Sequence, residues 1–403
     1  MSSAVQEVAL SHPQVTNAPS RLYSLDVFRG ATIATMILVN NPGTDFAYSP
    51  LKHSIWNGWT PTDLIFPFFL FIVGVSLVLS YRSRIERGES KRTLMIHALR
   101  RSVIIFLIGL FLNGLPYFHL STWRVAGVLQ RIAIAYLAAA VITLYSGTRA
   151  VVVWIAGLLV GYWIVMRFIP VPGIGVPSRD MPLLDPDANL DWYLDRHYLP
   201  GAMYEKTRDP EGILSTFPSI ATALLGVLTG LWLKDGGKSA AQTTSGRLSL
   251  PSDSIRKATV MLSSGVALIV AGQVWNIWFP INKKLWTSSF VIFTAGCALV
   301  ALAIGYWITD VKQHRGPWTK AFLVFGTNAI AAYTLAELAS ILLYNVHVPS
   351  GRRVLTLQDF LYRAFFSGVT PKQLGSLAYA ALFVCLCWLP IYWLYRKRIF
   401  LKV

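Results

Sequence analysis

Apolar residues in this chain form long continuous runs, not the spaced stripes of amphipathic helices. Runs of about 18 or more apolar residues with few charges predict membrane-spanning helices, because a helix needs about 20 residues to cross the hydrocarbon layer. The pattern therefore predicts an all-α, polytopic integral membrane protein with about ten transmembrane helices. The runs lie near residues 25–41, 64–81, 95–112, 126–145, 150–168, 217–233, 258–276, 288–309, 321–344 and 376–395.

Composition and charge agree with this interpretation. The chain is 54% hydrophobic and 14% charged, whereas about a quarter of the residues of a soluble domain are charged. Its net charge of +17 comes from 36 Lys and Arg residues, most of which fall in alternate loops and near the two termini. The positive-inside rule then places both termini in the cytoplasm. Membrane lipid, and not nucleic acid, is the partner that this distribution predicts.

Four segments describe the predicted organisation. Residues 1–20 are polar, lack an apolar signal-peptide core and predict a flexible cytoplasmic tail. Residues 21–403 form a single transmembrane domain. Within it, residues 169–216 combine Pro, Gly and Asp with aromatic residues and predict an ordered, lid-like loop on the non-cytoplasmic face. Residues 234–257 are rich in Gly, Ser and Thr and predict a flexible cytoplasmic linker. The three cysteines fall within spans and lack metal-site spacing, so we expect no metal.

The start of the first span carries charged residues. Asp26 falls in the first helical turn, where a carboxylate complements the helix dipole. Arg29 lies one turn into the membrane and needs an anion, which can be Asp26 or a phosphate group. Arg21 precedes both residues.

The segment that follows the first span contains the sequence HSIWNGWTPTDLIFP. Thr60 and Asp63 have the spacing of a helix capping box, so Asp63 has a structural interpretation. His53 lies in a loop beside Trp56 and Asn57, and a lone loop histidine is most often a surface residue. Its position after the membrane-embedded Asn40 raises the alternative of a catalytic histidine.

Other polar residues lie inside spans or directly before them. Inside a membrane such residues either pair between helices or form a substrate or proton site, and before a span they can simply begin a helix. The pattern fits a transporter or an enzyme that works across the membrane. The residues are Gln130, Arg131, Asp209, Glu211, Asn282, Lys284, Trp286, Asn328 and Glu337.

Several segments, in the same order, resemble the transmembrane acyltransferase family typified by lysosomal heparan-α-glucosaminide N-acetyltransferase and its bacterial relatives. They are RLYSLDVFRG, HSIWNGWTPTDLIFP, GVLQRIAIAY, DPEGILSTFPSI, INKKLWTSSFV and the closing YRKRIFLKV. The resemblance extends from Arg21 to the C-terminus, and its histidine-containing motif is long and unusual.

This resemblance implies transfer of an acetyl group from cytoplasmic acetyl-CoA to the amine of a glucosamine on the far side. It implies that His53 is the essential histidine, with Asn40 as its partner and Asp63 as an orienting group. His53 can attack the thioester or deprotonate the acceptor ammonium, and Asn40 can stabilise the oxyanion. The residues expected to bind acetyl-CoA are Arg21, Asp26, Arg29, Gln130 and Arg131. Those expected near the acceptor are Trp56, Asn57, Asp209, Glu211, Asn282, Lys284, Trp286, Asn328 and Glu337.

The sequence departs from the lysosomal enzyme because it has no match to the N-terminal luminal domain and the span before it. We therefore expect a small amino sugar as acceptor, a bacterial inner membrane as location and, from the family, a homodimer. Two alternatives stay open. One is a secondary transporter of an amino sugar or organic anion that uses Glu337 or Arg131, although no inverted repeat is visible. The other is an O-acyltransferase of an envelope glycan.

Overall fold

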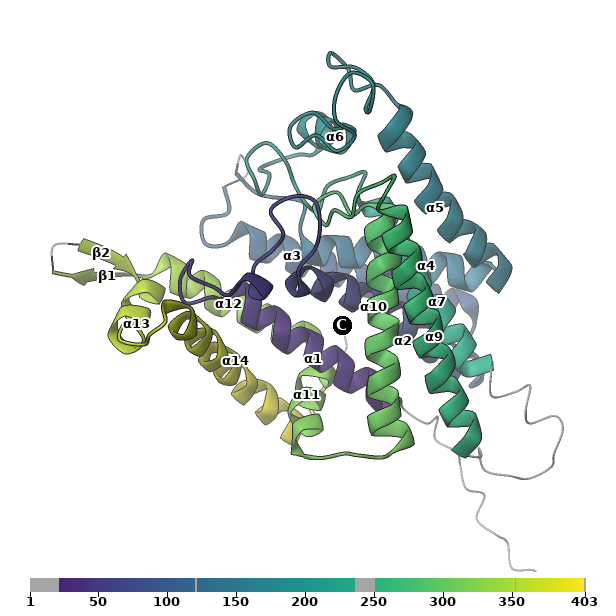
Figure 1. Ribbon diagram of the computed structural model, residues 1–403. Coiled ribbons are helices and arrows are strands. Elements are labelled where there is room, and N and C mark those ends of the chain that lie inside the picture. Colours follow the sequence, from purple (N-terminus) through teal and green to yellow (C-terminus); the bar gives the residue numbers. More distant parts are fainter. Residues whose placement is uncertain (1–21, 120–121, 236–250, 352, 402–403) are drawn as a thin grey trace, which may run out of the picture.

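The computed structural model describes residues 22–119, 122–235, 251–351 and 353–401, which form a bundle of helices with one short hairpin (Figure 1). The predicted tail at 1–20 and most of the predicted linker at 234–257 lie outside the described residues. The first half of the chain contains α1 (Tyr23–Asn40), η1 (Ser49–Leu51), η2 (Pro61–Leu64), α2 (Ile65–Ile85), α3 (Lys91–Gly114), α4 (Val128–Tyr145), α5 (Thr148–Phe168) and α6 (Leu190–Tyr198). The second half contains α7 (Thr216–Asp235), α9 (Pro251–Trp275), α10 (Ser288–Tyr306), η3 (Trp307–Val311), α11 (Pro317–Thr327), α12 (Ala329–Asn345), β1 (His347–Ser350), β2 (Arg353–Thr356), α13 (Leu357–Phe365) and α14 (Lys372–Arg396).

The number of membrane-spanning helices agrees with the pattern of apolar runs. Among the described residues, 8 helices are long and apolar enough to cross a membrane, or up to 9 if the bent pair α11 and α12 is one span. Helix α1 has 18 residues and falls outside this set because Asp26, Arg29 and Asn40 lower its hydropathy. It nevertheless packs among the spans, against α11, α10, α2 and α14. The prediction of an all-α, polytopic membrane protein is confirmed, and the orientation of the termini stays a prediction.

One predicted span is wrong as a continuous helix. The apolar run at 321–344 is broken at Asn328, where α11 and α12 meet at an angle of 82°. The Asn328 amide donates to the Ile399 carbonyl at 3.1 Å and accepts the Leu401 N–H at 2.9 Å. Because the amide is buried, these bonds to the C-terminal segment satisfy groups that would otherwise be costly in a membrane. The polar residue within the run therefore marks a bend.

Small residues set the closest helix contacts. A Cβ atom on Gly30 would collide with the Phe322 carbonyl of α11, and one on Gly326 would collide with the Asp26 carbonyl of α1. Gly74 of α2 lies in the same way against the Ala223 carbonyl of α7. Because lipid tails are as apolar as the side chains, such close backbone packing drives helix association in membranes.

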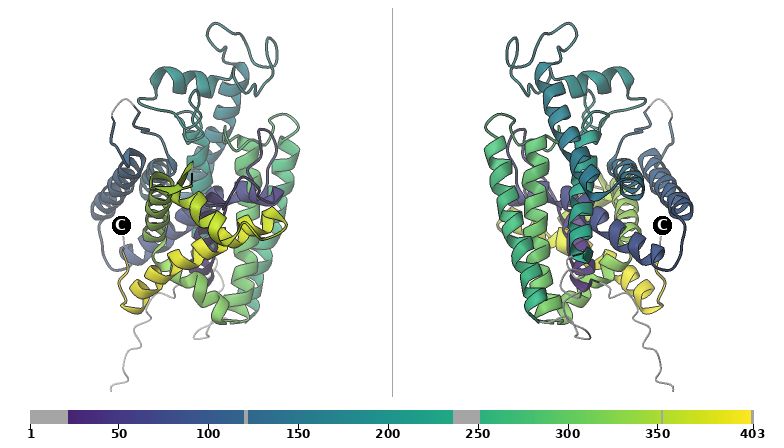
Figure 2. Two further views of the ribbon diagram at one scale, coloured as in Figure 1. Left: turned by 90° about the vertical axis from the view of Figure 1, so that its left-hand side faces the viewer. Right: turned by 90° about the vertical axis from the view of Figure 1, so that its right-hand side faces the viewer.

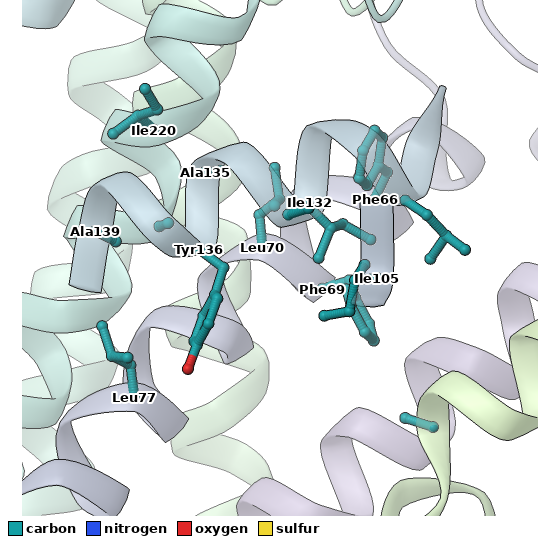
Figure 3. Close-up of a cluster of buried hydrophobic side chains, with 14 of the residues drawn as sticks. Phe66, Phe69, Leu70, Leu77, Ile105, Ile132, Ala135, Tyr136, Ala139 and Ile220 are labelled. Atoms are coloured by element: carbon teal, nitrogen blue, oxygen red, sulfur yellow. The ribbon is translucent and has the colours of Figure 1, made fainter. Parts of the chain in front are cut away.

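The largest buried cluster includes side chains of α2, α3, α4 and α7 and extends to α1, α5, α10, α11, α12 and α14. Figure 3 shows Phe66, Phe69, Leu70, Ile105 and Ile132 pointing toward one another. Helices α3, α5 and α9 expose much more of their apolar surface than α2 does, as expected of helices that face lipid.

The loop at 169–216 is an ordered segment with its own hydrophobic cluster. Trp192 of α6 is 1% exposed and packs with Leu184, Leu190, Phe279 and Leu285. Figure 2 shows the α6 segment at one end of the bundle. This segment therefore joins the loop at 276–287, and a role as a lid stays a prediction.

Candidate active site

His53 and Asp63 form a close pair in the loop between α1 and α2. The Nδ1 atom of His53 lies 2.7 Å from Oδ1 of Asp63. The other carboxylate oxygen, Oδ2, accepts the Thr60 N–H at 3.0 Å and the Ser54 N–H at 3.0 Å, and the Thr60 hydroxyl oxygen lies 3.1 Å from it. The predicted capping interaction of Thr60 and Asp63 is therefore present. The same carboxylate caps a helix with one oxygen and holds the histidine with the other.

A hydrogen bond from a neutral His53 to Asp63 requires one particular tautomer. An ionised carboxylate can only accept hydrogen bonds, so Nδ1 carries the proton that is donated to Asp63. Nε2 then carries the lone pair. The Asp63 side chain is 1% exposed and the His53 side chain is 49% exposed. The imidazole is therefore held by a buried carboxylate but remains accessible to solvent. A histidine arranged in this way can act as a nucleophile or as a general base.

Backbone and hydroxyl contacts hold the loop that carries His53. The Thr60 hydroxyl donates to the Lys52 carbonyl at 2.6 Å, and the Thr62 hydroxyl donates to the Pro50 carbonyl at 3.0 Å. Gly58 has a φ of +96°, a conformation that favours glycine. Its N–H donates to the Ile281 carbonyl at 2.8 Å. The loop is thereby attached to the segment that precedes α10.

That segment is a tight turn organised by Asn282, which is fully buried. Its side-chain oxygen Oδ1 accepts the Leu285 N–H at 3.0 Å, and its side-chain Nδ2 donates to Oδ1 of Asn57 at 3.1 Å. Trp286 has a φ of +49° and donates through its indole N–H to the Thr222 hydroxyl at 3.1 Å. Asn57 and Asn282 therefore join two loops around His53. Trp286 is 1% exposed and contributes to packing.

The turn directs its two lysines to different partners. Lys283 Nζ lies 2.9 Å from Nδ1 and 3.4 Å from Nε2 of His53, and 3.4 Å from Oδ1 of Asp63. Lys284 instead pairs with Glu205 at 2.7 Å. Burial lowers the pKa of Lys283, and the Asp63 and Glu211 carboxylates act in the opposite direction. Lys283 was not among the residues singled out in the sequence, and its only signal there is its place in the INKKLW motif.

A second polar cluster lies beside α7 and consists of Arg124, Asp209 and Glu211. Arg124 donates to Asp209 through Nε at 2.7 Å and through Nη2 at 2.6 Å, and Nη2 also pairs with Glu211 at 2.6 Å. Asp209 is fully buried and accepts the N–H groups of Tyr204 and Glu211 as well. Burial opposes the charge of Arg124, but the two ion pairs outweigh it and raise its pKa. Arg124 is a second residue that sequence reasoning missed.

Arg131 of α4 is buried beneath this cluster. Its Nη2 atom donates to the Ser215 hydroxyl at 2.7 Å and to the Gly212 carbonyl at 3.3 Å, and the guanidinium lies 5.2 Å from the Trp286 ring centroid. Its Nε and Nη1 atoms have no hydrogen-bond partner among the described residues. Arg131 thus ties α4 to the start of α7.

Two carboxylates of α6 complete this region. Asp191 accepts the Ser215 N–H at 2.9 Å, and Asp195 accepts the Ile213 N–H at 2.8 Å. Burial raises the pKa of Asp195 to about 6, and the Asp209 carboxylate adds to the effect. Burial also raises the pKa of Asp191 well above its usual value. The α6 segment is therefore docked on the N-terminus of α7 through acidic groups that hold protons more tightly than free aspartates.

A separate polar cluster lies at the start of α1. Arg29 pairs with Asp26 at 3.1 Å, donates to the Gly326 carbonyl at 3.1 Å and donates to the Ser76 hydroxyl at 2.6 Å. The anion expected for Arg29 is therefore provided by Asp26 in this structure. Binding of a phosphate by Arg29 stays a prediction, and Arg21 lies outside the described residues.

The remaining predicted residues are distributed around these clusters. Asn40 lies exposed at the end of α1, and within the described chain it makes no hydrogen bond to His53. The Trp56 indole donates to the Leu184 carbonyl at 2.9 Å. Gln130 is buried against Gly109 and Gly127, so it packs α4 on α3.

Glu337 of α12 is hydrogen-bonded to Tyr333, which lies within electrostatic range of Arg124 and Glu211. Asn328 occupies the helix break described above. A role in binding stays a prediction for each of these residues.

The fold and the site together define a multi-pass helical membrane protein with an accessible histidine held by a buried carboxylate. Comparison with known proteins gives the family. Residues 21–254 match the family model described as heparan-alpha-glucosaminide N-acetyltransferase, catalytic. The chain is 32% identical over 368 residues to the heparan-alpha-glucosaminide N-acetyltransferase of Mus musculus, an alignment that covers 79% of this chain and 53% of that protein. It is 31% identical over 371 residues to the protein of that name from Homo sapiens, with 78% and 52% covered.

The chain therefore belongs to the family defined by the catalytic region of heparan-α-glucosaminide N-acetyltransferase, and the predicted family is confirmed. The chain spans about half the length of these curated relatives.

Proposed function

We propose that this protein is a transmembrane N-acetyltransferase. It takes the acetyl group of acetyl-CoA on the cytoplasmic side and transfers it to the amine of glucosamine, or of a terminal glucosaminide, on the opposite side. The observation that carries the proposal is the His53–Asp63 pair at 2.7 Å. Family membership supplies the acetyl chemistry, because the matched relatives are named as N-acetyltransferases.

Helix α1 connects the two ends of the proposed reaction path. Arg29 and Asn40 are separated by about 16 Å along the helix axis, given a rise of about 1.5 Å per residue. Acetyl-CoA is a polyanion with a long, thin arm. We place its phosphates near Arg21 and Arg29, where charge-assisted hydrogen bonds favour them, and its thioester near Asn40 and His53. Arg29 must then exchange part of its pairing with Asp26 for a phosphate.

Two routes use the same His53 geometry. In the first, Nε2 attacks the thioester carbonyl carbon, the carbon–sulfur bond breaks, and CoA leaves as a thiolate. The acceptor amine then attacks the acetyl-imidazole, and the imidazole is restored. In the second, Nε2 takes a proton from the acceptor ammonium, and the free amine attacks the thioester carbonyl carbon. The carbon–sulfur bond breaks, CoA leaves as a thiolate, and the proton lost by the attacking nitrogen passes to that thiolate. Asp63 holds and orients the imidazole in either route.

Purified protein in detergent tests the activity with acetyl-CoA labelled in the acetyl group and glucosamine as acceptor. We expect label in N-acetylglucosamine with wild type and a loss of at least about 10³-fold with His53→Ala, since the reacting group is absent. Binding of acetyl-CoA should persist in that variant. Wild-type protein that neither binds acetyl-CoA nor transfers the label would overturn the proposal and favour transport.

Proteoliposomes test the sidedness of the reaction. Acetyl-CoA is enclosed in the vesicles or added outside, and glucosamine is supplied on the opposite side only. Transfer should require the two substrates on different sides for any one orientation of the protein. Label that appears only when both substrates share a side would contradict a transmembrane reaction.

Acid quenching of the enzyme with labelled acetyl-CoA separates the two routes. Label on the peptide that contains His53 supports the acetyl-imidazole, whereas absence of label with full activity supports direct transfer. Parallel assays with hydroxyl acceptors separate the N-acetyltransferase from an O-acyltransferase.

The proposed location is a bacterial inner membrane, and the proposed assembly is a homodimer. Both come from the family resemblance, and cross-linking in isolated membranes tests the second.

A further inference from the structure

The His53 cluster, defined as His53, Asp63 and Lys283, contains one anion and two groups that can carry a positive charge. Asp63 is nearly inaccessible, and its Oδ2 accepts the N–H groups of Ser54 and Thr60. Its Oδ1 faces both His53 and Lys283, at 2.7 Å and 3.4 Å. One carboxylate can compensate one cation in such a place, and a second positive charge would be uncompensated.

We infer that Lys283 is a positioning residue that supplies the cation balancing Asp63 and thereby keeps His53 uncharged, with its Nε2 lone pair available. The catalytic consequence of this role rests on the proposed function. The charge state of His53 does not, because it follows from the three side chains alone.

Lysine is the stronger base of the two side chains, so the proton that gives the cluster its positive charge binds to Lys283. The ordinary pKa values of lysine and histidine side chains differ by about four units, with lysine the stronger base. Burial works against the Lys283 ammonium more than against the half-exposed imidazole, but the Asp63 and Glu211 carboxylates both favour the ammonium. The cluster therefore holds its single positive charge on Lys283.

The other charges that face this cluster do not change the balance. Glu211 acts on Lys283 and favours its ammonium, whereas Lys284 opposes it. Both are themselves engaged, Glu211 with Arg124 at 2.6 Å and Lys284 with Glu205 at 2.7 Å. The close 2.9 Å approach of Nζ to Nδ1 then places the ammonium against the imidazole, where it opposes a second positive charge.

Removal of Lys283 should make His53 easier to protonate. Asp63 would then be free to stabilise an imidazolium, and the histidine would lose its reactive lone pair at mildly acidic pH. Replacement of Asp63 should have the opposite effect, because Lys283 alone would face the imidazole.

Chemical modification of His53 measures this directly and needs no acetyltransferase activity. Diethyl pyrocarbonate transfers an ethoxycarbonyl group to an unprotonated imidazole nitrogen, and the other half leaves as ethyl carbonate. The rate is followed between pH 5 and 9 by mass spectrometry of the peptide that contains His53, in detergent-purified full-length protein. His53 is half exposed and accessible to the reagent.

We expect the midpoint of the pH profile to rise by about one unit in Lys283→Met, which is about tenfold slower modification at acidic pH. Asp63→Asn should move the midpoint downward. Lys283→Arg should keep the wild-type midpoint, because it keeps the charge. Lys52→Met is the matched control, since Lys52 adjoins His53 in sequence but lies exposed to solvent, where charges are screened.

An unchanged midpoint in Lys283→Met would overturn the inference, as would an equal rise in Lys52→Met. If Lys283→Met does not fold, a downward shift in Asp63→Asn together with the wild-type midpoint in Lys283→Arg supports the inference, and no shift in Asp63→Asn refutes it. The acetyl-transfer assay on the same variants is separate. A shifted modification profile without transfer in wild type would refute the proposed function and leave the inference standing.

Discussion

The His53 cluster and the Arg124 cluster combine the same kinds of groups in opposite ways. In the Arg124 cluster (Arg124, Asp209 and Glu211), a guanidinium is shared by two carboxylates, and the fully buried Asp209 accepts four hydrogen bonds. In the His53 cluster, the carboxylate is equally buried, but the imidazole that it holds is 49% exposed. The first arrangement satisfies all the acceptors of its central carboxylate, whereas the second leaves a nitrogen lone pair accessible. The Arg124 cluster is thus arranged for stability, and the His53 cluster is arranged for reactivity.

The difference follows from the partners that surround each carboxylate. Arg124 offers a planar fork that matches a carboxylate in two places. His53 donates one N–H to Asp63, and its second nitrogen, Nε2, remains available to react. We expect substitutions in the Arg124 cluster to affect folding first, and substitutions in the His53 cluster to affect turnover first.

Asp63→Asn should produce the largest effect on turnover. The amide cannot hold the imidazole as the carboxylate does and can fix the wrong tautomer, so we expect kcat to fall by about 10³-fold. Labelled acetyl transfer measures this, with the melting temperature as the control for folding. Equal losses of stability and activity would show that Asp63 serves only as a helix cap.

Arg124→Met should produce the largest effect on stability. The fully buried Asp209 and the partly buried Glu211 would lose their counter-ion, which costs on the order of 3 kcal/mol. Thermal melting of the detergent-purified protein measures the change. Arg179→Met is the matched control, because Arg179 pairs with Asp180 at 2.9 Å in an exposed position, where an ion pair contributes little. If both variants melt alike, the contrast between the two clusters fails.

The pH dependence of stability should report on Asp195. Its pKa is about 6, which is above the usual value for an aspartate, so the folded state binds the proton more tightly than the unfolded state. Its contribution is therefore most favourable at acidic pH and is lost as the pH rises through about 6. Asp195→Asn should remove this dependence and stabilise the protein at pH 8 by on the order of 2 kcal/mol. Melting curves between pH 5 and 8 test this, and a variant with the wild-type pH slope contradicts it.

Asn282→Ala should have the smallest of these effects. It removes the bond to Asn57 that joins the two loops around His53, at 3.1 Å, and the bond that closes the turn. We expect kcat to fall about tenfold through misplacement of His53, which corresponds to roughly one lost buried hydrogen bond. A loss confined to KM would instead assign Asn282 to acceptor binding.

The elements of the bundle were largely predictable, because membrane spans are read from apolar runs that must satisfy their backbone internally. The break at Asn328 was not. A single amide within an apolar run is compatible with a straight helix, and the bend depends on the C-terminal segment that bonds to it. The contact between His53 and Asp63 was expected from the family resemblance, whereas the residues alone gave Asp63 only a capping role.

Sequence by itself determined the class of the protein, the places of its spans and the motif that carries His53, since each of these depends on local composition and spacing. Tertiary structure alone decided which charges meet. Lys283 and Lys284 are neighbours of the same type, yet one contacts His53 and the other pairs with Glu205. Arg124 lies far from Asp209 in the chain, and their pairing depends on how α4 and α7 pack. Long-range pairs of this kind leave no local pattern in one sequence, because any buried carboxylate can be matched by any cation that the fold brings to it.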